Sequence, residues 1–371
     1  MNLLIFISSL SSGGAERVAA NLANHWAGKG WTITIVTLAP LQIDFYELNP
    51  AIQRITLNQI GSSSHALCAT WNNLRRIRAL RQVLRQVCPD IALSLMSTTN
   101  VLLALAAWGL PLCAIGSEHI HPPQLPLNRV WEGLRRNFYS RLVAVTALTK
   151  ESAAWLKNQT RARQVPVIPN AAPWPLPEQS PYLDPTMVGV TGQQRLLAVG
   201  RLDCQKGFDR LLTAFADLAN RYPHWDLVIL GEGPLRPVLQ AQIDAANLQQ
   251  RVFMPGRAGN IGQWYASADL YVMSSRFEGF PNTLTEALTY GLPVVSFDCK
   301  TGPRDIIRHE VDGLLVPADH ITALTEALDR FMDDADLRQR FSERAIEARE
   351  RFSIDSVSQK WERLFDKLCR Q

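Results

Sequence analysis

The sequence predicts an α/β protein with two doubly wound parallel sheets, and three observations support this fold class. Short runs rich in Val, Ile and Leu alternate with helical patterns rather than with hairpin turns, which is typical of parallel sheets covered by helices. A length of 371 residues with 47% apolar content is enough for two ordinary domains. Five prolines in residues 173–185 exclude both a helix interior and a central strand, and they separate the runs into two sets.

The expected strands follow in chain order. In the first half they are Leu3–Ser8, Thr32–Leu38, Asp90–Met96, Leu112–Ser117, Arg141–Ala147 and Gln164–Ile168. In the second half they are Arg195–Val199, Asp226–Leu230, Arg251–Met254, Ala268–Ser274, Pro293–Phe297 and Gly313–Val316. We therefore expect a first domain over residues 1–172, a proline-rich linker over 173–190, a second domain over 191–352 and a C-terminal helix over 353–371.

Composition and charge narrow the class of protein. No run of about 18 apolar residues occurs, and the apolar start lacks a basic segment and a cleavage site, so we expect a first strand there rather than a signal peptide. The six cysteines have no paired spacing, which argues against a disulfide framework or a zinc site and favours the cytoplasm. Residues 1–180 carry 16 Lys and Arg against 8 Asp and Glu, whereas the remainder carries 22 against 26. The first half should therefore face an anionic partner.

The most informative motif is a pair of acids, Glu278 and Glu286, with seven residues between them. The pair follows the expected strand Ala268–Ser274, and a turn with Gly279 and Pro281 leads into a helix start without a capping side chain. Free backbone N–H groups would then lie beside two carboxylates, which suits a polyhydroxylated ligand that carries phosphate. The motif indicates a nucleotide sugar. Glycoside hydrolysis fits less well, because its two acids oppose each other across the bond, whereas Glu286 is expected two helical turns beyond Glu278.

A glycine pair follows the first expected strand. Gly13 and Gly14 would permit close approach to the backbone, and the N-terminus of the following helix would attract an anion. A plain tight turn between strand and helix would look the same. The loop does not read Gly-x-Gly-x-x-Gly, so no dinucleotide cofactor is expected.

Two loops of the second half carry further candidates at strand ends, where doubly wound sheets hold their ligands. Arg201 gives a planar fork and Lys206 a compact point charge, which together suit a pyrophosphate. Either could also be an ordinary solvated cation. Gly231 and Glu232 end the next strand, where small residues would let a base or a ribose approach.

Together these residues resemble the retaining glycosyltransferases of family 4, which have the two-domain GT-B fold. The resemblance covers nearly the whole chain and rests on the order and spacing of four segments: Gly13-Gly14, Gly200-Arg201-Leu202 with Lys206-Gly207, Gly231-Glu232-Gly233, and Glu278 to Glu286. It implies two Rossmann-like domains that face each other across a cleft, with the C-terminal helix packed back on the first domain.

The resemblance also implies roles for single residues. Arg201 and Lys206 would hold the donor diphosphate, Glu286 the ribose hydroxyls, and Glu278 the donor sugar. The rest of the implied donor site is Gly231, Glu232, Gly279, Phe280, Asn282, Thr283 and Leu284. His119 would lie near the reacting sugar, and Gly13, Gly14 and Glu118 would belong to the acceptor side.

The implied mechanism needs no protein nucleophile. The acceptor hydroxyl would attack the face from which the nucleotide leaves, a donor phosphate oxygen would take the proton, and the configuration at the anomeric carbon would be retained. Arg201 and Lys206 would offset the charge of the leaving diphosphate, so we expect neither a metal nor a cofactor. The acidic cluster Asp333–Asp336 lies between two helical patterns and is interpreted as a helix cap.

The acceptor is inferred from the basic first half. One face of residues 71–85 gathers Arg75, Arg78, Arg81 and Arg85, and a solvated helix face explains that pattern equally well. Residues 128–142 place Val130, Trp131, Leu134 and Phe138 on one side, with Arg129, Arg135, Arg136 and Arg141 around them. Such helices would rest on anionic lipid, and similar basic helices occur in family members that extend polyprenyl-diphosphate-linked sugars. We expect a peripheral protein at the cytoplasmic membrane face with a lipid-linked saccharide acceptor and no nucleic acid partner.

The donor sugar and two rival functions remain open. The stretch Ser296–Asp305 resembles the branch of the family that builds cell-surface polysaccharides and lipid-linked oligosaccharides, often from UDP-hexoses or UDP-N-acetylhexosamines, but Lys300 and Asp305 depart from its pattern. A nucleotide-sugar epimerase shares the fold class and would act without an acceptor. A non-catalytic membrane-bound scaffold would explain the arginines, but not the register of the cations and the two glutamates.

Overall fold

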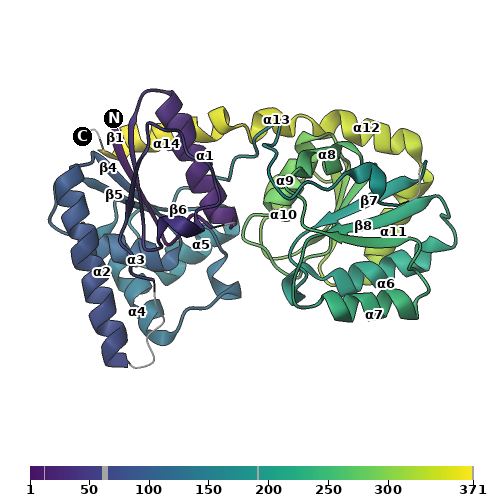
Figure 1. Cartoon of the computed structure of the whole chain (residues 1–371), viewed down its shortest axis with the longest axis horizontal. Coiled ribbons are helices and arrows are strands. Elements are labelled where there is room, and N and C mark those ends of the chain that lie inside the picture. The colour runs from purple at the N-terminus through teal and green to yellow at the C-terminus, as the bar shows by residue number, and fades with distance from the viewer. Residues whose placement is uncertain (12, 61–65, 190–191, 370–371) are drawn as a thin grey trace. The chain divides into compact units, whose positions relative to one another are not determined.

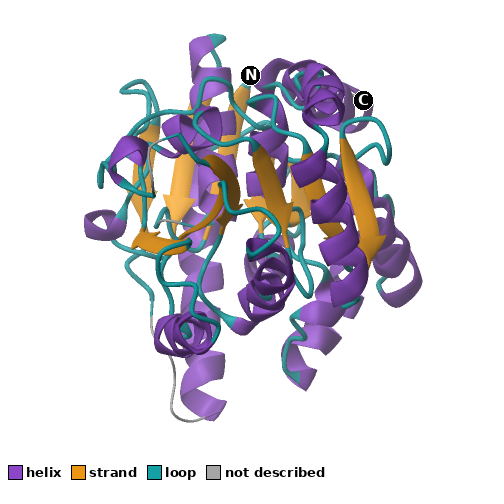
Figure 2. Cartoon of the chain, turned by 90° about the vertical axis from the view of Figure 1, so that its right-hand side faces the viewer, coloured by secondary structure: helices purple, strands orange, loops and turns teal. Residues whose placement is uncertain are grey.

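The chain forms two units in the computed structural model (Figure 1), which describes residues 1–11, 13–60, 66–189 and 192–369. Unit 1 consists of Met1–Ala171 together with Ile354–Gln371, and unit 2 of Ala172–Ser353. Residue 190 of the expected linker and residues 370–371 of the expected C-terminal helix lie outside the described residues. Figure 2 shows the strands with helices on both sides, as expected for doubly wound sheets.

Unit 1 contains a parallel sheet whose described strands follow the order β3-β2-β1-β4-β5-β6. The strands are β1 (Asn2–Ile7), β2 (Thr32–Thr37), β3 (Gln53–Thr56), β4 (Ile91–Leu95), β5 (Cys113–Glu118) and β6 (Ala144–Ala147). The α-helices are α1 (Gly14–Gly28), α2 (Ala66–Val87), α3 (Ser97–Ala106), α4 (Arg129–Phe138), α5 (Lys150–Gln159) and α14 (Ile354–Cys369). Short 3₁₀ turns are η1 (Leu41–Ile43), η2 (Pro122–Gln124) and η3 (Tyr139–Arg141).

Strand β1 shows why an apolar run without polar alternation lies in the middle of this sheet. Successive side chains of a strand point to opposite faces, so Leu3, Ile5 and Ile7 enter one hydrophobic cluster while Leu4 and Phe6 enter the other. Both faces of the strand are therefore buried. Helix α14 covers the first of these clusters.

Unit 2 repeats the architecture, and its described strands follow the order β12-β11-β10-β7-β8-β9. The strands are β7 (Gln194–Val199), β8 (Trp225–Leu230), β9 (Val252–Gly256), β10 (Leu270–Met273), β11 (Val294–Asp298) and β12 (Gly313–Pro317). The α-helices are α6 (Phe208–Ala219), α7 (Arg236–Ala245), α8 (Ile261–Ala266), α9 (Asn282–Thr289), α10 (Pro303–Ile306), α11 (Ile321–Asp333), α12 (Ala335–Ala345) and α13 (Ala348–Arg351). The 3₁₀ turns are η4 (Pro185–Met187) and η5 (Cys204–Lys206).

Some details of the first half differ from the sequence prediction. The expected strand Gln164–Ile168 is wrong, because its backbone hydrogen bonds to residues 145–147 form an isolated bridge between Val167 and Ala147 rather than a strand. Pro166 within that run lacks the N–H group that a ladder requires. Strand β3 was not predicted, because its sequence Gln-Arg-Ile-Thr at the sheet edge carries a weak apolar signal.

Two further expectations concern cysteine and the acidic cluster. Cys68, Cys88, Cys204 and Cys299 are free thiols among the side chains that the structure describes. Cys113 forms a disulfide, which the cysteine spacing did not indicate. The acidic cluster acts as a cap, because Asp334 precedes α12 and its side chain accepts a hydrogen bond of 2.8 Å from the Leu337 N–H.

Candidate active site

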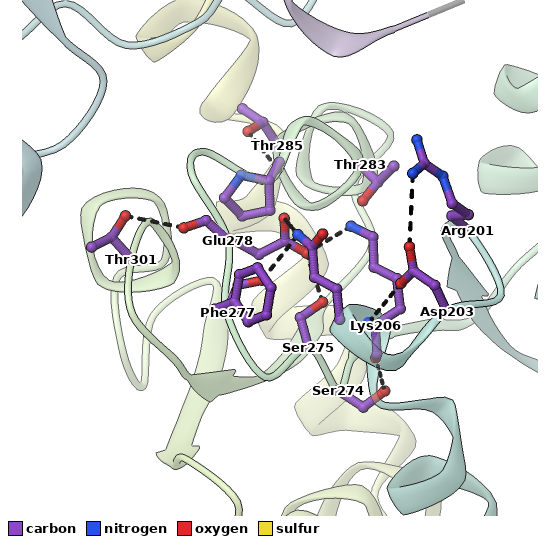
Figure 3. A network of polar contacts seen from close by, with 12 residues as sticks. Arg201, Asp203, Lys206, Ser274, Ser275, Phe277, Glu278, Thr283, Thr285 and Thr301 are labelled. Carbon is purple, nitrogen blue, oxygen red and sulfur yellow. Dashed lines mark hydrogen bonds and ion pairs between the residues drawn. The ribbon is translucent and has the colours of Figure 1, made fainter. Parts of the chain in front are cut away.

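An ion pair between Lys206 and Glu278 forms the centre of a polar network in unit 2 (Figure 3). The Lys206 Nζ lies 2.6 Å from Oε1 of Glu278, and the side chains are 18% and 7% exposed. Ser275 donates its hydroxyl to the same oxygen at 2.6 Å. Gln205 donates to Oε2 at 3.4 Å and to the backbone oxygen of Phe277 at 3.1 Å. A nearly buried carboxylate is thus paired with a cation and with two uncharged donors.

The loop after β7 directs Lys206 to this place through its small residues. A Cβ on Gly200 would lie 2.9 Å from two carbons of the Lys206 side chain, so the lysine crosses over that glycine. Gly207 has a φ of +63° and its Cβ would lie 2.2 Å from the backbone oxygen of Ser274. These glycines permit the close approach of the loops after β7 and β10 that brings Lys206 to Glu278.

The loop that carries Glu278 is fixed to the loop after β11. The N–H of Glu278 donates to the backbone oxygen of Lys300 at 3.0 Å, and the N–H of Thr301 donates back to that of Glu278 at 3.0 Å. The hydroxyl of Thr301 donates to the backbone oxygens of Glu278 and Gly279 at 3.3 and 3.1 Å. The structure therefore places Thr301 beside the candidate site.

Helix α9 begins next to the ion pair and carries the second acid. No side chain caps its start at Pro281, and the N-terminus of a helix carries the partial positive charge of its dipole. Glu286 is buried and accepts a hydrogen bond of 3.1 Å from the hydroxyl of Tyr265. The expectation that Glu286 lies two helical turns beyond Glu278 is wrong, because Glu278 belongs to the loop before α9.

Other residues of the implied donor site have structural contacts of their own. Tyr271 donates a hydrogen bond of 2.8 Å to the hydroxyl of Thr283, and burial raises the pKa of this tyrosine. The N–H of Leu284 donates to the backbone oxygen of Pro281 at 3.1 Å. Phe280 is buried in an edge contact with Phe352.

Two charged residues of the implied donor site lie apart from the ion pair. The side chain of Arg201 is 74% exposed and its nearest acid, Asp203, is 3.9 Å away. Figure 3 shows the guanidinium directed toward Asp203 rather than toward Glu278. Glu232 pairs with Arg236, and the hydrogen bonds from this arginine hold the pKa of the Glu232 carboxyl below its usual range. Gly231 allows the loop after β8 to approach, because its Cβ would lie 1.9 Å from the backbone oxygen of Gly200.

His119 lies in unit 1, where β5 ends. Its side chain is buried, and burial lowers its pKa to about 4. The ring atom Nε2 lies 3.1 Å from the hydroxyl of Ser117, which accepts a hydrogen bond of 2.8 Å from Thr146. The Nδ1 atom has no hydrogen-bond partner within the described part of the chain. The imidazole is therefore neutral near pH 7 and retains one unused polar atom.

Glu118 belongs to a buried network rather than to an open surface. Ser97 donates to its carboxyl at 2.7 Å, and Tyr139 also donates to it. Burial raises the pKa of Glu118, and this effect is opposed by the positive charge of Arg135 and by the two hydrogen bonds.

The glycine pair of unit 1 marks the start of α1. A Cβ on Gly13 would clash with the carboxyl of Glu16 at 2.1 Å, so this acid folds back over the glycine. Ser9 donates to the same carboxyl at 3.2 Å, and Tyr46 donates to the backbone oxygen of Gly13 at 2.9 Å. Gly14 is exposed.

The arginines of α4 separate into two kinds. Arg129 and Arg136 are exposed. Arg135 is only 1% exposed, pairs with Glu132 and stacks over Trp155 at 4.7 Å. The expectation that Arg135 faces an acceptor or a membrane is therefore corrected, because its guanidinium is enclosed within unit 1.

Sequence reasoning missed the residues that contact the acids. Ser275, Gln205 and Tyr265 have no motif of their own, although Ser275 lies between the expected strand and the first acid.

No group of three possible metal ligands occurs among the described residues, and none of the described helices is both long and apolar enough to cross a membrane.

Comparison with known families gives matches over most of the chain. Residues 12–173 match Glycosyltransferase Family 4, and residues 189–348 match Glycosyl transferases group 1. The chain is 27% identical over 367 residues to the amylovoran biosynthesis glycosyltransferase AmsD of Erwinia amylovora, with 97% of this chain and 98% of the relative covered. It is also 27% identical over 367 residues, with 98% of both chains covered, to the GalNAc-alpha-(1->4)-GalNAc-alpha-(1->3)-diNAcBac-PP-undecaprenol alpha-1,4-N-acetyl-D-galactosaminyltransferase of Campylobacter jejuni.

Solved structures share the fold over the whole length. The Anabaena protein Alr3699/HepE in complex with UDP superposes with a TM-score of 0.80 at 19% identity and covers 99% of this chain and 100% of its own. Sucrose-phosphate synthase from Thermosynechococcus elongatus gives a TM-score of 0.80 at 18% identity, with 99% of both chains covered. Both family matches, the full-length relatives and the two parallel sheets agree: the chain is a glycosyltransferase with the two-domain GT-B fold and belongs to family 4.

Proposed function

We propose that this glycosyltransferase moves a hexose or an N-acetylhexosamine from a nucleotide sugar, in particular a UDP-sugar, to a lipid-linked saccharide. The observation that carries the proposal is the Lys206–Glu278 pair beside the uncapped start of α9. A cation suits the diphosphate, a carboxylate suits sugar hydroxyls, and the positive end of a helix dipole suits phosphate oxygens. Further support comes from the Campylobacter relative, whose name gives an undecaprenol-linked acceptor, and from a structural neighbour in complex with UDP.

In the proposed mechanism the protein binds, orients and stabilises charge. Glu278 accepts hydrogen bonds from the donor sugar, Glu286 binds the ribose, and Lys206 offsets the charge of the leaving diphosphate. Arg201 is exposed, and its contact with Asp203 is as long as 3.9 Å, so its guanidinium can turn to the same diphosphate. The acceptor hydroxyl attacks the face from which the diphosphate leaves and gives its proton to a phosphate oxygen. The configuration at the anomeric carbon is then retained, without a metal or a cofactor.

The proposed acceptor side uses unit 1 and the cytoplasmic face of the membrane. Neutral His119 offers a hydrogen-bonding nitrogen to a sugar substrate. Exposed Arg129 and Arg136 on α4, together with Val130, which is 70% exposed, suit anionic headgroups and the acyl boundary.

Binding and transfer by the purified protein test this proposal. We expect one of a panel of UDP-, GDP- and ADP-sugars to raise the melting temperature in the presence of a chelator, and added divalent metal to give no further rise. With that donor and a polyprenyl-diphosphate-linked saccharide, we expect a product with the anomeric configuration of the donor, measured by NMR. Inversion, or strict dependence on metal, would contradict the mechanism.

Variants and a control without acceptor distinguish the rival functions. Lys206→Ala should reduce transfer by at least about a hundredfold, because removing one group that stabilises transition-state charge has costs of this order. Conversion of the sugar without any acceptor would indicate an epimerase. Failure to bind any nucleotide sugar would indicate a scaffold.

A further inference from the structure

The Glu278 carboxylate accepts hydrogen bonds from two uncharged donors in addition to its ion pair with Lys206. Its Oε1 accepts hydrogen bonds from the Lys206 ammonium and the Ser275 hydroxyl, both at 2.6 Å (Figure 3). Its Oε2 accepts a hydrogen bond from the Gln205 amide at 3.4 Å. The carboxylate side chain is only 7% exposed, so little of it is in contact with water. An ionised group in such a position depends on each partner that it keeps.

Lys206 has two competing uses. In the structure its charge is neutralised by Glu278, whereas the proposed function requires the same charge for the donor diphosphate. Attraction to the carboxylate therefore opposes binding of the diphosphate. When the ammonium moves toward phosphate oxygens, the buried carboxylate loses its only cation among the contacts described around it.

We propose that Ser275 and Gln205 are positioning residues that hold the Glu278 carboxylate while Lys206 turns to the donor diphosphate. The inference rests on the proposed function, because it takes the diphosphate as the second partner of Lys206. Both donors are uncharged and therefore bind the carboxylate without drawing the diphosphate away from the lysine. Both are also held in place: Ser275 is 1% exposed and is the second residue after β10, and Gln205 is anchored on the backbone oxygen of Phe277 at 3.1 Å.

The first test removes the competing charge. Glu278→Gln keeps the shape of the side chain and an oxygen that can accept from Ser275, but it releases Lys206. We expect the affinity for the nucleoside diphosphate that the wild type binds, among UDP, GDP and ADP, to rise about tenfold in calorimetric titration. Glu310→Gln is the matched control, because it removes the same charge from an exposed pair with Arg330 and should leave the affinity unchanged.

The second test removes the supporting hydroxyl. Ser275→Ala should weaken binding of the same diphosphate about tenfold, because the carboxylate then retains Lys206 more strongly. Ser275→Thr keeps the hydroxyl and should restore the affinity, and Gln205→Met should give a smaller loss because its bond is longer. A general loss of structure would weaken binding of the diphosphate in Glu278→Gln and in Ser275→Ala alike. A gain of affinity in the first variant and a loss in the second are therefore specific to the exchange of partners by Lys206.

The outcomes separate this inference from the proposed function. If the wild type binds a diphosphate but Glu278→Gln does not bind it more tightly, or Ser275→Ala binds it as the wild type does, the exchange of partners is wrong. If the wild type binds no nucleotide of the panel, the proposed function fails and the inference fails with it.

Discussion

Two buried titratable side chains of this protein differ in their partners. Glu278 remains close to a cation although it is nearly buried. His119 is also buried, its Nε2 lies beside the Ser117 hydroxyl, and burial lowers its pKa from 6.5 to about 4. A histidine with a lowered pKa offers a neutral ring to a substrate. It also makes folding sensitive to acid.

The pH dependence of stability should reveal this histidine. Above pH 6.5 the ring is neutral in both folded and unfolded chains; as the pH falls, the unfolded chain binds a proton that the folded chain excludes until about pH 4. We expect the wild type to lose about 3 kcal/mol of unfolding free energy relative to His119→Gln across this window. Urea unfolding of both proteins at a series of pH values measures the difference, and parallel pH profiles would contradict it.

At the scale of the elements, helix α4 has one arginine packed in the protein interior and two arginines on its exposed face. Its partly buried Trp131, Leu134 and Phe138 pack against a core cluster of unit 1. Arg135 lies among the buried residues, whereas Arg129 and Arg136 point to solvent. Val130, expected on the apolar side, is instead exposed. The helix therefore has a packed face and an exposed basic face with one apolar side chain.

The two kinds of arginine should respond differently to substitution. Replacing Arg129 and Arg136 together by Gln should weaken binding to vesicles that contain anionic lipid by about 2 kcal/mol, since each nearby cation contributes about 1 kcal/mol, and should not change unfolding. Arg135→Gln should retain vesicle binding but lower the unfolding free energy by about 2 kcal/mol, because Glu132 and Trp155 lose their partner. Sedimentation with vesicles and urea unfolding measure the two effects; equal losses of vesicle binding would contradict the distinction.

At the scale of the whole molecule, the chain leaves unit 1 for unit 2 and returns to it with α14. Trp361 and Phe365 of this helix join the core cluster that contains Trp26. Glu362 accepts hydrogen bonds from Trp26 and Lys29. The hydrophobic core of unit 1 therefore includes side chains of the C-terminal helix α14.

Shortening a core side chain of α14 should destabilise unit 1 more than unit 2. Trp361 is 3% exposed, and Trp361→Ala should cost about 3 to 5 kcal/mol of stability. Gln359→Ala on the exposed side of the same helix should change stability by less than about 0.5 kcal/mol. In Trp361→Ala, hydrogen exchange resolved by peptide should be faster than in the wild type throughout residues 1–171. Faster exchange confined to unit 2 would contradict this assignment.

Local pattern was enough to predict much of the fold and part of the candidate site. The alternation of apolar runs with helical patterns predicted two doubly wound sheets, which the structure and its neighbours confirm. The order of the motifs also predicted the family, which both family matches confirm. These features are legible because β1 and β10 are continuous apolar runs, and because Glu278 and Glu286 lie close together in the sequence.

The fold class, the family and the type of chemistry could be predicted from the amino-acid sequence, because periodicity and short spacing record local structure. The three-dimensional structure was needed to show which of several similar residues act together. Lys206 and Glu278 lie 72 positions apart and meet because their loops follow neighbouring strands of one parallel sheet. Arg135 and Arg136 are adjacent in sequence, yet one is enclosed and the other exposed. Contacts between distant segments depend on packing, and packing has no signature in local sequence.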